Sequence, residues 1–295
     1  MRSLLALAGS VPLALVLLGC TQQVSASGEA TDAEAGASMT AVIGIERTSA
    51  GGEPATSETV ARFVRMHGPA SSDEALRAVG AMVEFPQLGG CIAFGTPQSA
   101  PAAQLVDVGA VSLEANGLDT RLIARQLPDV GDVVTGVGYG RTAAPGAFPA
   151  RTRYVLHVSG SPEFDLAPFE VAAAAPADLE LTIAGQEARG TVVLTQGEPL
   201  LLAWNAGAPD DMVYVDLAPR QATATTPTMR CAFADTGGAT IASSLLPGPD
   251  GTLRIHRLHR EAFAAHGIDA GEMRFDFAQI AGFVVVPRAE GQSLR

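Results

Sequence analysis

Hydrophobic and polar residues alternate with a period of two along most of the chain. In residues 273–279, MRFDFAQ, Phe275 and Phe277 point to one face while Arg274 and Asp276 point to the other, as in a half-buried strand. Residues 59–66, TVARFVRM, alternate in the same way. Similar short runs, separated by Gly, Pro and Asp, occupy residues 40–48, 110–115, 132–140, 153–160, 179–185, 191–196, 199–207, 212–219, 229–235, 252–258 and 283–287. This series of short strands predicts an all-β protein.

Three segments depart from the alternating pattern. The run LLLAW, residues 200–204, is continuously apolar, which predicts a strand covered on both faces, with Trp204 buried and its ring N–H bonded to a partner. Residues 71–85 predict a helix, because Ser71 precedes Glu74 by three positions, and Leu76, Val79 and Val83 share one helical face. Residues 260–267, REAFAAHG, predict two helical turns that end at Gly267.

Turn residues recur every 8–12 positions between these strands, as is typical of an antiparallel β-sandwich with one or two short helices. We expect this sandwich to cover residues 39–290. Two packed sandwich lobes, with a boundary near residue 176, are the alternative to a single sandwich.

The N-terminal segment predicts export. Residues 1–19 have one positive charge followed by about 15 apolar residues, which is too short to span a bilayer and fits a cleaved leader. Residues 20–38 are small, polar and acidic, and predict a flexible tether.

The end of the leader, Leu17-Leu18-Gly19-Cys20, resembles the lipobox of bacterial lipoproteins. The resemblance implies cleavage before Cys20, acylation of Cys20, and a membrane anchor that is stable because it uses more than one acyl chain. Thr21, in place of Asp, implies sorting to the outer membrane. Ordinary leader cleavage near Ala26, which would discard Cys20, is the alternative.

Composition narrows the choice of partners. The net charge is −12, the chain has no lysine, and its arginines form no basic run. Nucleic-acid binding depends on neutralising phosphates, so the sequence argues against a nucleic-acid partner. The negative net charge also argues against electrostatic docking on anionic lipid. The acyl chains alone would then have to hold the protein at the membrane.

Two cysteines remain after Cys20. Because exported proteins fold in an oxidising compartment, Cys91 and Cys231 predict a disulfide, with two free thiols as the alternative. Such a bond would join the first third of the chain to the last third, which favours one cooperative unit over two independent domains.

The order of several further segments is similar to that in a group of uncharacterised lipoproteins from myxobacteria and their relatives. These segments include VSLEA, LLLAWNAG, RCAFADTGGATIASSLL and TLRIHR, and the similarity covers about residues 60–260. The resemblance implies a β fold and a lipid anchor. It implies no activity.

Candidate catalytic chemistry centres on Asp235. The triplet Asp235-Thr236-Gly237 is similar to the active-site triplet of aspartic proteases, in which two aspartates share a proton. The chain has no second Asp-Thr-Gly and no Gly-x-Ser-x-Gly motif. We therefore favour a glycine-rich turn in which the Asp235 side chain bonds the backbone two residues on.

Other candidate sites are weaker. His256, His259 and His266 do not have the spacing of one metal site, and we expect His256 to face solvent. We interpret Arg254, Arg257 and Arg260 as charges that protect an edge strand. The glycines of GVGYG, residues 136–140, predict a strand or bulge instead of a nucleotide loop. Asp210, Asp211 and Asp250 predict solvated turns, with Ca²⁺ binding as the alternative.

The sequence therefore predicts a lipid-anchored, exported binding or structural component of the cell envelope, without catalysis, cofactor or metal. Its expected partners are the membrane, through Cys20, and a protein or saccharide. The alternative is an envelope hydrolase that works through Asp235 or a metal-assisted histidine.

Overall fold

Strand β19 (Ile268–Val286) runs through the centre of a sheet of eleven strands, the long sheet. At about 3.3 Å per residue this 19-residue strand spans roughly 60 Å. The order across the long sheet is β3 (Cys91–Phe94), β16 (Thr228–Ala234), β15 (Met212–Pro219), β18 (Asp250–Ala265), β19, β1 (Ser38–Ala50), β2 (Thr56–Met66), β4 (Ala103–Leu105), β8 (Val134–Ala143) and β7 (Ile123–Leu127), and β13 (Thr191–Thr195) pairs with the end of β19.

The computed structural model describes residues 38–66, 72–79, 81, 83–94, 103–127, 134–143, 146, 148–220 and 228–288. All of them belong to one compact unit, residues 34–295. Within these ranges no helix has the length and apolar character needed to cross a bilayer.

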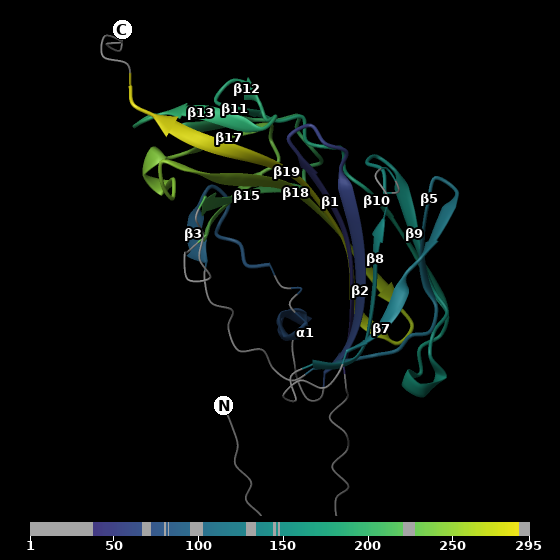
Figure 1. The fold of residues 1–295 in the computed structure, drawn as a ribbon. Helices are drawn as coiled ribbons and strands as arrows, with labels where there is room; N and C mark the ends of the chain where they lie inside the picture. The colour runs from purple at the N-terminus through teal and green to yellow at the C-terminus, as the bar shows by residue number, and fades with distance from the viewer. Residues whose placement is uncertain are drawn as a thin grey trace, which may run out of the picture. The chain divides into compact units, whose positions relative to one another are not determined.

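Two small sheets of four strands each complete the fold (Figure 1). The first small sheet contains β10 (Phe169–Ala174), β9 (Arg153–Val158), β5 (Val111–Ala115) and β6 (Leu118–Arg121). The second contains β12 (Gln186–Glu187), β11 (Thr182–Ile183), β14 (Leu200–Ala203) and β17 (Gly238–Ile241). Two 3₁₀ turns, η1 (Pro162–Phe164) and η2 (Ser243–Leu245), lie in the connections.

Both small sheets pack on the same face of the long sheet, as the side chains of β19 that contact them show. Phe275 and Phe277 belong to the core cluster beneath the first small sheet, and Ala281 and Phe283 to the cluster beneath the second. These positions have the same parity, so their side chains leave the strand on one side. We call this side the inner face. We use the name seam for the place where the two core clusters adjoin. The prediction of an all-β sandwich is confirmed. We call each small sheet, together with the core cluster beneath it, a lobe.

The opposite face of the long sheet carries the single α-helix of the described residues, α1 (Ser72–Ala78) (Figure 1). Ala75, Ala78 and Val79 are buried against Val64 and other side chains of β1, β2 and β4. The predicted helix thus exists, but it is shorter than residues 71–85. Val83 lies beyond its end.

The helix predicted at residues 260–267 is wrong. Residues 260–265 continue strand β18, and Phe263 pairs with Gly271 of β19 and contacts the Phe169 ring at 6.2 Å. Pairing with β19 and packing on the first small sheet outweigh the local helix propensity of this segment. Gly267 has a left-handed backbone, φ +80°, but it forms the hairpin turn to β19 and not a helix cap.

The predicted double coverage of residues 200–204 is also wrong. Leu200, Leu202 and Trp204 are buried, whereas Leu201 is 53% exposed. Strand β14 lies in a small sheet that packs on only one side, so the continuous apolar run reflects one buried face and one open face.

Candidate functional site

The predicted lipidation site, Cys20, lies outside the described residues, together with the leader and most of the tether. Acylation of Cys20 therefore stays a prediction.

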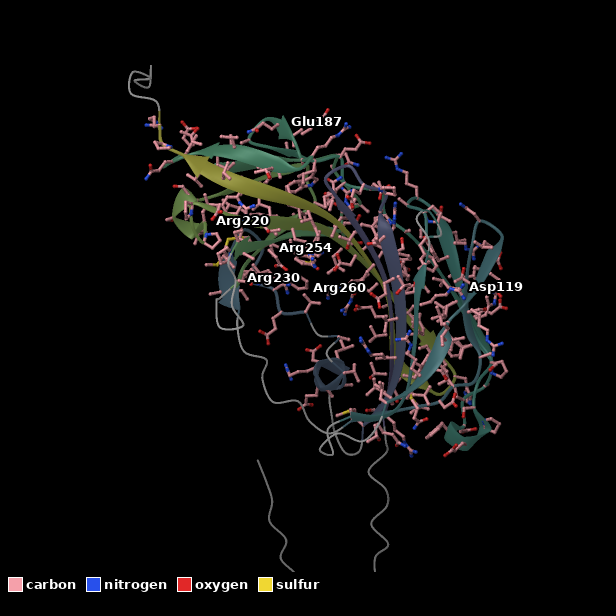
Figure 2. All side chains as sticks on the ribbon, in the orientation of Figure 1. Asp119, Glu187, Arg220, Arg230, Arg254 and Arg260 are labelled. Carbon is pink, nitrogen blue, oxygen red and sulfur yellow. A yellow bond between two sulfur atoms is a disulfide. The ribbon has the colours of Figure 1, made fainter. Side chains whose placement is uncertain are left out.

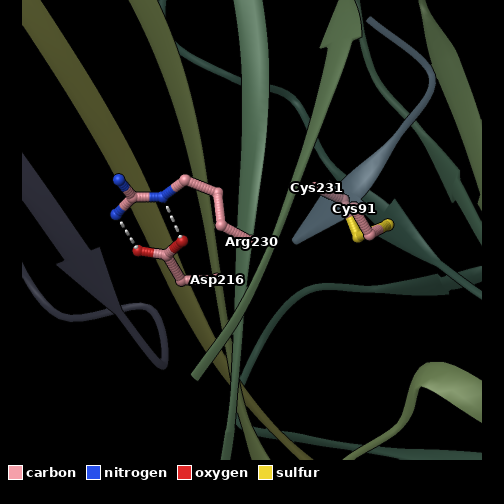
Figure 3. The surroundings of a disulfide bond; sticks show 4 residues. All are labelled: Cys91, Asp216, Arg230 and Cys231. Atoms are coloured by element: carbon pink, nitrogen blue, oxygen red, sulfur yellow. Dashed lines mark hydrogen bonds and ion pairs between the residues drawn. A yellow bond between two sulfur atoms is a disulfide. The ribbon is translucent and has the colours of Figure 1, made fainter. Parts of the chain in front are cut away.

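The predicted disulfide is confirmed. Cys91 of β3 and Cys231 of β16 lie opposite each other in the long sheet and are bonded (Figure 3). Beside them, Arg230 donates two hydrogen bonds to the Asp216 carboxylate, both 2.7 Å long. The bond joins residues 140 positions apart and ties the edge strand β3 to the body of the sheet.

Asp235 is a buried structural carboxylate. Its side chain is fully buried and lies 2.6 Å from Nε of Arg257, and the Trp204 ring N–H donates to Asp235 Oδ1 at 2.7 Å. The expected partner for Trp204 is thus confirmed. Asp235 does stand in a turn before Gly237, but the expected bond from its side chain to the backbone two residues on is wrong, because the carboxylate binds Arg257 and Trp204 instead.

Arg257 is the residue that the sequence interpretation missed. Its strand, β18, is central and not an edge, lying between β15 and β19, and its side chain is fully buried on the inner face. It also donates to the carbonyl oxygens of Ala177 (2.9 Å), Asp178 (3.2 Å) and Asn205. Residues 177–178 connect the two small sheets, so Arg257 fixes the crossing at the seam. The sequence could have predicted this burial, because Arg257 lies two and four positions after Ile255 and Leu253, whose side chains point inward.

His256 does not face solvent, contrary to expectation. It leaves β18 on the face opposite Ile255, yet it is only 7% exposed, stacks on Tyr214 at 4.1 Å and places Nδ1 2.6 Å from Asp276 Oδ1. The Tyr214 hydroxyl donates to the other Asp276 oxygen at 2.5 Å. Burial, followed by the Asp276 charge, raises the pKa of Tyr214 well above its ordinary value.

A segment of the chain covers this outer-face cluster. We call residues 83–94 the cover segment. Its Phe85 ring lies 5.1 Å from the Tyr214 ring, and the guanidinium groups of Arg230 and Arg260 lie 5.7 and 5.3 Å from the Phe85 ring. At its far end, Gly89 and Gly90 hydrogen-bond to the backbone of Ala232. Phe85 contacts Tyr214, the ring on which His256 stacks, so this distant segment packs on the outer-face cluster that contains His256.

His259 and Asp211 form a second pair, on the inner face. The solvated turn expected at Asp211 is therefore wrong, because Asp211 is only 4% exposed. His259 Nδ1 lies 2.6 Å from Asp211 Oδ1. The hydrogen bond with Asp211 raises the pKa of His259. Burial alone would raise the pKa of Asp211, but hydrogen bonds from His259 and the Ala208 N–H lower it below its ordinary value. A Cβ on Gly207 would collide with both Asp211 and Asp235, so the two carboxylates lie close together.

This pair predicts a pH-dependent contribution to stability. Because the pKa of His259 is raised in the folded state, its stabilisation is complete below pH 6.5 and is lost as the pH rises through the folded-state pKa. Because the pKa of Asp211 is lowered, its stabilisation is present above pH 3.8 and is lost as the pH falls. We expect His259→Gln to lower the free energy of unfolding on the order of 1 kcal/mol more at pH 5.5 than at pH 9.

Urea unfolding at the two pH values measures this difference. His266→Gln is the control, since His266 is exposed in the β18–β19 turn. Equal losses for His259→Gln at both pH values would contradict the charged pair.

The remaining candidates do not form a site. Asp250 pairs with Arg220 at 3.5 Å, Asp210 is exposed, and no set of three His, Cys, Asp or Glu side chains within the described ranges could hold a metal ion. Gly136, Gly138 and Gly140 lie in strand β8, as predicted. At Gly136 a Cβ would collide with the Leu105 carbonyl oxygen, which explains one of these glycines.

A groove at the seam is the candidate binding site. A cavity of about 590 Å³ adjoins a second of about 220 Å³, and the two share Ser49, Leu179 and Gln279. We call them together the seam groove. Its lining comes from the β1–β2 turn, the crossing between the small sheets and the β11–β12 hairpin, and comprises Arg47, Ser49, Ala50, Gly51, Gly52, Ala55, Asp178, Leu179, Glu180, Leu181, Thr182, Glu187, Ala188, Arg189, Phe277, Ala278 and Gln279.

No protein-family model matches the chain, and no curated protein does. Among solved structures, the mouse nectin-like molecule 4 ectodomain (Ig1–Ig3) aligns with 88% of this chain and 67% of its own at 10% identity and a TM-score of 0.21. The Fcho1 Mu homology domain of Danio rerio, with bound Eps15 peptide, aligns with 84% of this chain and 96% of its own at 10% identity and a TM-score of 0.24. Rst D1-D2 aligns with 70% of this chain and 98% of its own at 10% identity and a TM-score of 0.17. Similarity this low identifies neither a family nor a function.

Proposed function

We propose that the protein is an exported, lipid-anchored component of the cell envelope that binds a ligand without catalysing a reaction, with the seam groove as its binding site. The observation that carries this proposal is the groove itself, an open site of ligand size at the junction of two lobes. Binding pockets occur preferentially at such junctions and commonly measure about 300–1,000 Å³.

The distribution of titratable groups supports binding over catalysis. Asp235 is neutralised by Arg257 within the seam, and Asp211 is paired with His259. A pair of catalytic aspartates that share a proton would need one raised pKa, whereas the pKa of Asp211 is lowered. The alternative function, an envelope hydrolase working through Asp235, would have to use a carboxylate that is fully buried and ion-paired.

The leader and the disulfide support the location. A bond between Cys91 and Cys231 suits the oxidising envelope, and the lipobox-like sequence before Cys20 suits acylation. We propose attachment to the outer membrane through this cysteine.

Metabolic labelling with radioactive palmitate tests the anchor. In a bacterial host that exports the full chain, we expect the wild-type protein to carry label and to enter the detergent phase. Cys20→Ser should lose essentially all label, because the acyl groups require the Cys20 thiol.

A variant with both Cys91→Ser and Cys231→Ser is the matched control, since it removes thiols but leaves the lipobox intact. Its label per molecule should equal that of the wild type. Label retained by Cys20→Ser, or a wild-type protein whose unmodified N-terminus lies downstream of residue 20, would refute the anchor.

A further inference from the structure

We infer that the seam groove takes a ligand that carries a primary amine or a guanidinium, and that Glu180 is the counter-ion of that group. This inference rests on the proposed function of the groove as a binding site, and it names the chemical class of the ligand.

Glu180 lines the larger cavity of the groove. Its neighbours Leu179 and Leu181 are 3% and 6% exposed and belong to the core cluster of the second lobe. Glu180 between them is exposed and lines the larger cavity, so its carboxylate is available to a ligand. Among the described residues, Glu180 has no ion-pair partner.

The backbone that carries Glu180 is held rigidly. The Glu180 N–H donates to Asn205 Oδ1 at 2.7 Å, and the Gln279 side-chain amide donates to the Leu179 carbonyl oxygen at 2.5 Å. The Asp178 carbonyl oxygen accepts from the side chains of Arg257 and Asn205. A carboxylate on a fixed backbone is preorganised, so a ligand that binds it need not order the segment first.

The other charged side chains of the groove already have partners. Arg47 lies 2.6 Å from Asp178 in the smaller cavity, and Arg189 lies 3.0 Å from Glu187 in the larger one. Glu180 is the one charged side chain of the described lining that has no ion-pair partner, so the net charge of the lining is negative. With a net charge of −12 on the whole chain, long-range attraction also favours a cationic ligand over an anionic one.

The rest of the larger cavity suits a short polar chain attached to the cation. Ser49 and Thr182 offer hydroxyl groups, Gln279 offers an amide, and Ala50 and Ala188 contribute to the apolar part of the wall. Hydroxyl and amide groups can hydrogen-bond to peptide groups, so a short basic peptide matches both the size and the chemistry of the groove.

Isothermal titration calorimetry on the full acylated chain in neutral detergent tests the inference. The probes are tri-lysine amide, its fully side-chain-acetylated neutral analogue, and tri-glutamate amide. We expect only tri-lysine amide to bind measurably. Glu180→Gln should weaken its binding about five- to tenfold, which corresponds to the loss of one partly exposed ion pair, about 1 kcal/mol.

Two variants serve as controls. Asp119→Asn removes one negative charge at an exposed position of strand β6, away from the groove residue Glu187 (Figure 2), and should leave tri-lysine affinity unchanged within about 1.5-fold. Ala50→Trp places a large side chain at an exposed groove position and should abolish binding of any probe that uses the groove.

The outcomes separate the two proposals. Equal weakening by Glu180→Gln and Asp119→Asn would overturn the role of Glu180, because only total charge would matter. Binding of the acetylated or glutamate probe that Ala50→Trp abolishes would overturn the cationic class and keep the groove as a binding site. Binding of no probe, or binding that is insensitive to Ala50→Trp, would refute the cationic-ligand inference. Binding that is insensitive to Ala50→Trp would also refute the groove as the binding site.

Discussion

Arg257→Met should lower the free energy of unfolding by about 3–5 kcal/mol, the usual loss when one partner of a buried ion pair is removed. The substitution keeps an unbranched side chain of similar length but leaves the Asp235 carboxylate without a counter-charge in a site that water does not reach. It also removes the donors to the carbonyl oxygens of Ala177, Asp178 and Asn205. Unsatisfied buried carbonyl groups add to the loss.

Urea unfolding followed by fluorescence measures the effect, because the chain has a single tryptophan and Trp204 donates to Asp235 at the seam. Arg254→Met is the matched control. It makes the same change three residues earlier on the same strand, at an exposed outer-face position, and should alter stability by no more than about 0.5 kcal/mol. A loss below about 1 kcal/mol for Arg257→Met would contradict the role assigned to this side chain.

A double variant identifies the cause of the loss. Asp235→Asn keeps an oxygen acceptor for the Trp204 ring N–H but removes the buried negative charge. Added to Arg257→Met, it should recover part of the lost stability, and the coupling energy from the double-mutant cycle should exceed about 1 kcal/mol. No recovery would assign the loss to the carbonyl groups instead of the charge.

The alternating pattern of the sequence predicted local features well. In residues 273–279 it gave the inward positions Phe275 and Phe277 correctly, because a strand that packs on one side must alternate. The same rule would have placed Arg257 inward with Leu253 and Ile255. The expectation that arginine stays at the surface led to the wrong interpretation, since a buried arginine is tolerated only where a carboxylate distant in sequence meets it.

Long-range contacts account for the other differences. His256 is buried against Tyr214, and the Tyr214 ring in turn contacts Phe85 of the cover segment, more than 160 positions earlier in the chain than His256. Residues 260–265 form a strand because β19 lies beside them, although their composition favours a helix. The seam groove combines the β1–β2 turn, the crossing between the small sheets, the β11–β12 hairpin and three positions of β19. Such a site carries no local motif, so sequence pattern alone could not reveal it.

Loss of the disulfide should have the other large effect. Replacing Cys91 and Cys231 together by Ala removes a cross-link between residues 140 positions apart. On the chain-entropy estimate for so long a loop, the free energy of unfolding should fall by about 4–5 kcal/mol. The mechanism acts on the unfolded chain, so the rest of the long sheet should keep its structure under native conditions.

A local effect should accompany the global one, because the disulfide also holds the end of the cover segment. Strand β3 has only four residues and pairs only with β16 among the described strands. Without the bond, the opening of β3 costs less free energy, and Phe85 loses its anchor over Tyr214. His256 beneath it should then become accessible to reagents in solution. Its Nε2 is buried and has no hydrogen-bond partner among the described residues, so it is free to react once uncovered.

Carbethoxylation by diethyl pyrocarbonate, read by mass spectrometry of peptides, separates local opening from global destabilisation. At a urea concentration where both proteins are fully folded by Trp204 fluorescence, we expect His256 to react at least about tenfold faster in the double-Ala variant than in the wild type. Exposed His266 should react equally in both, which controls for reagent and pH. Unchanged protection of His256 together with a stability loss of about 4–5 kcal/mol would mean that the bond restrains only the unfolded chain. In that case contacts of Phe85 with Tyr214, Arg230 and Arg260 would be sufficient to hold the cover segment closed.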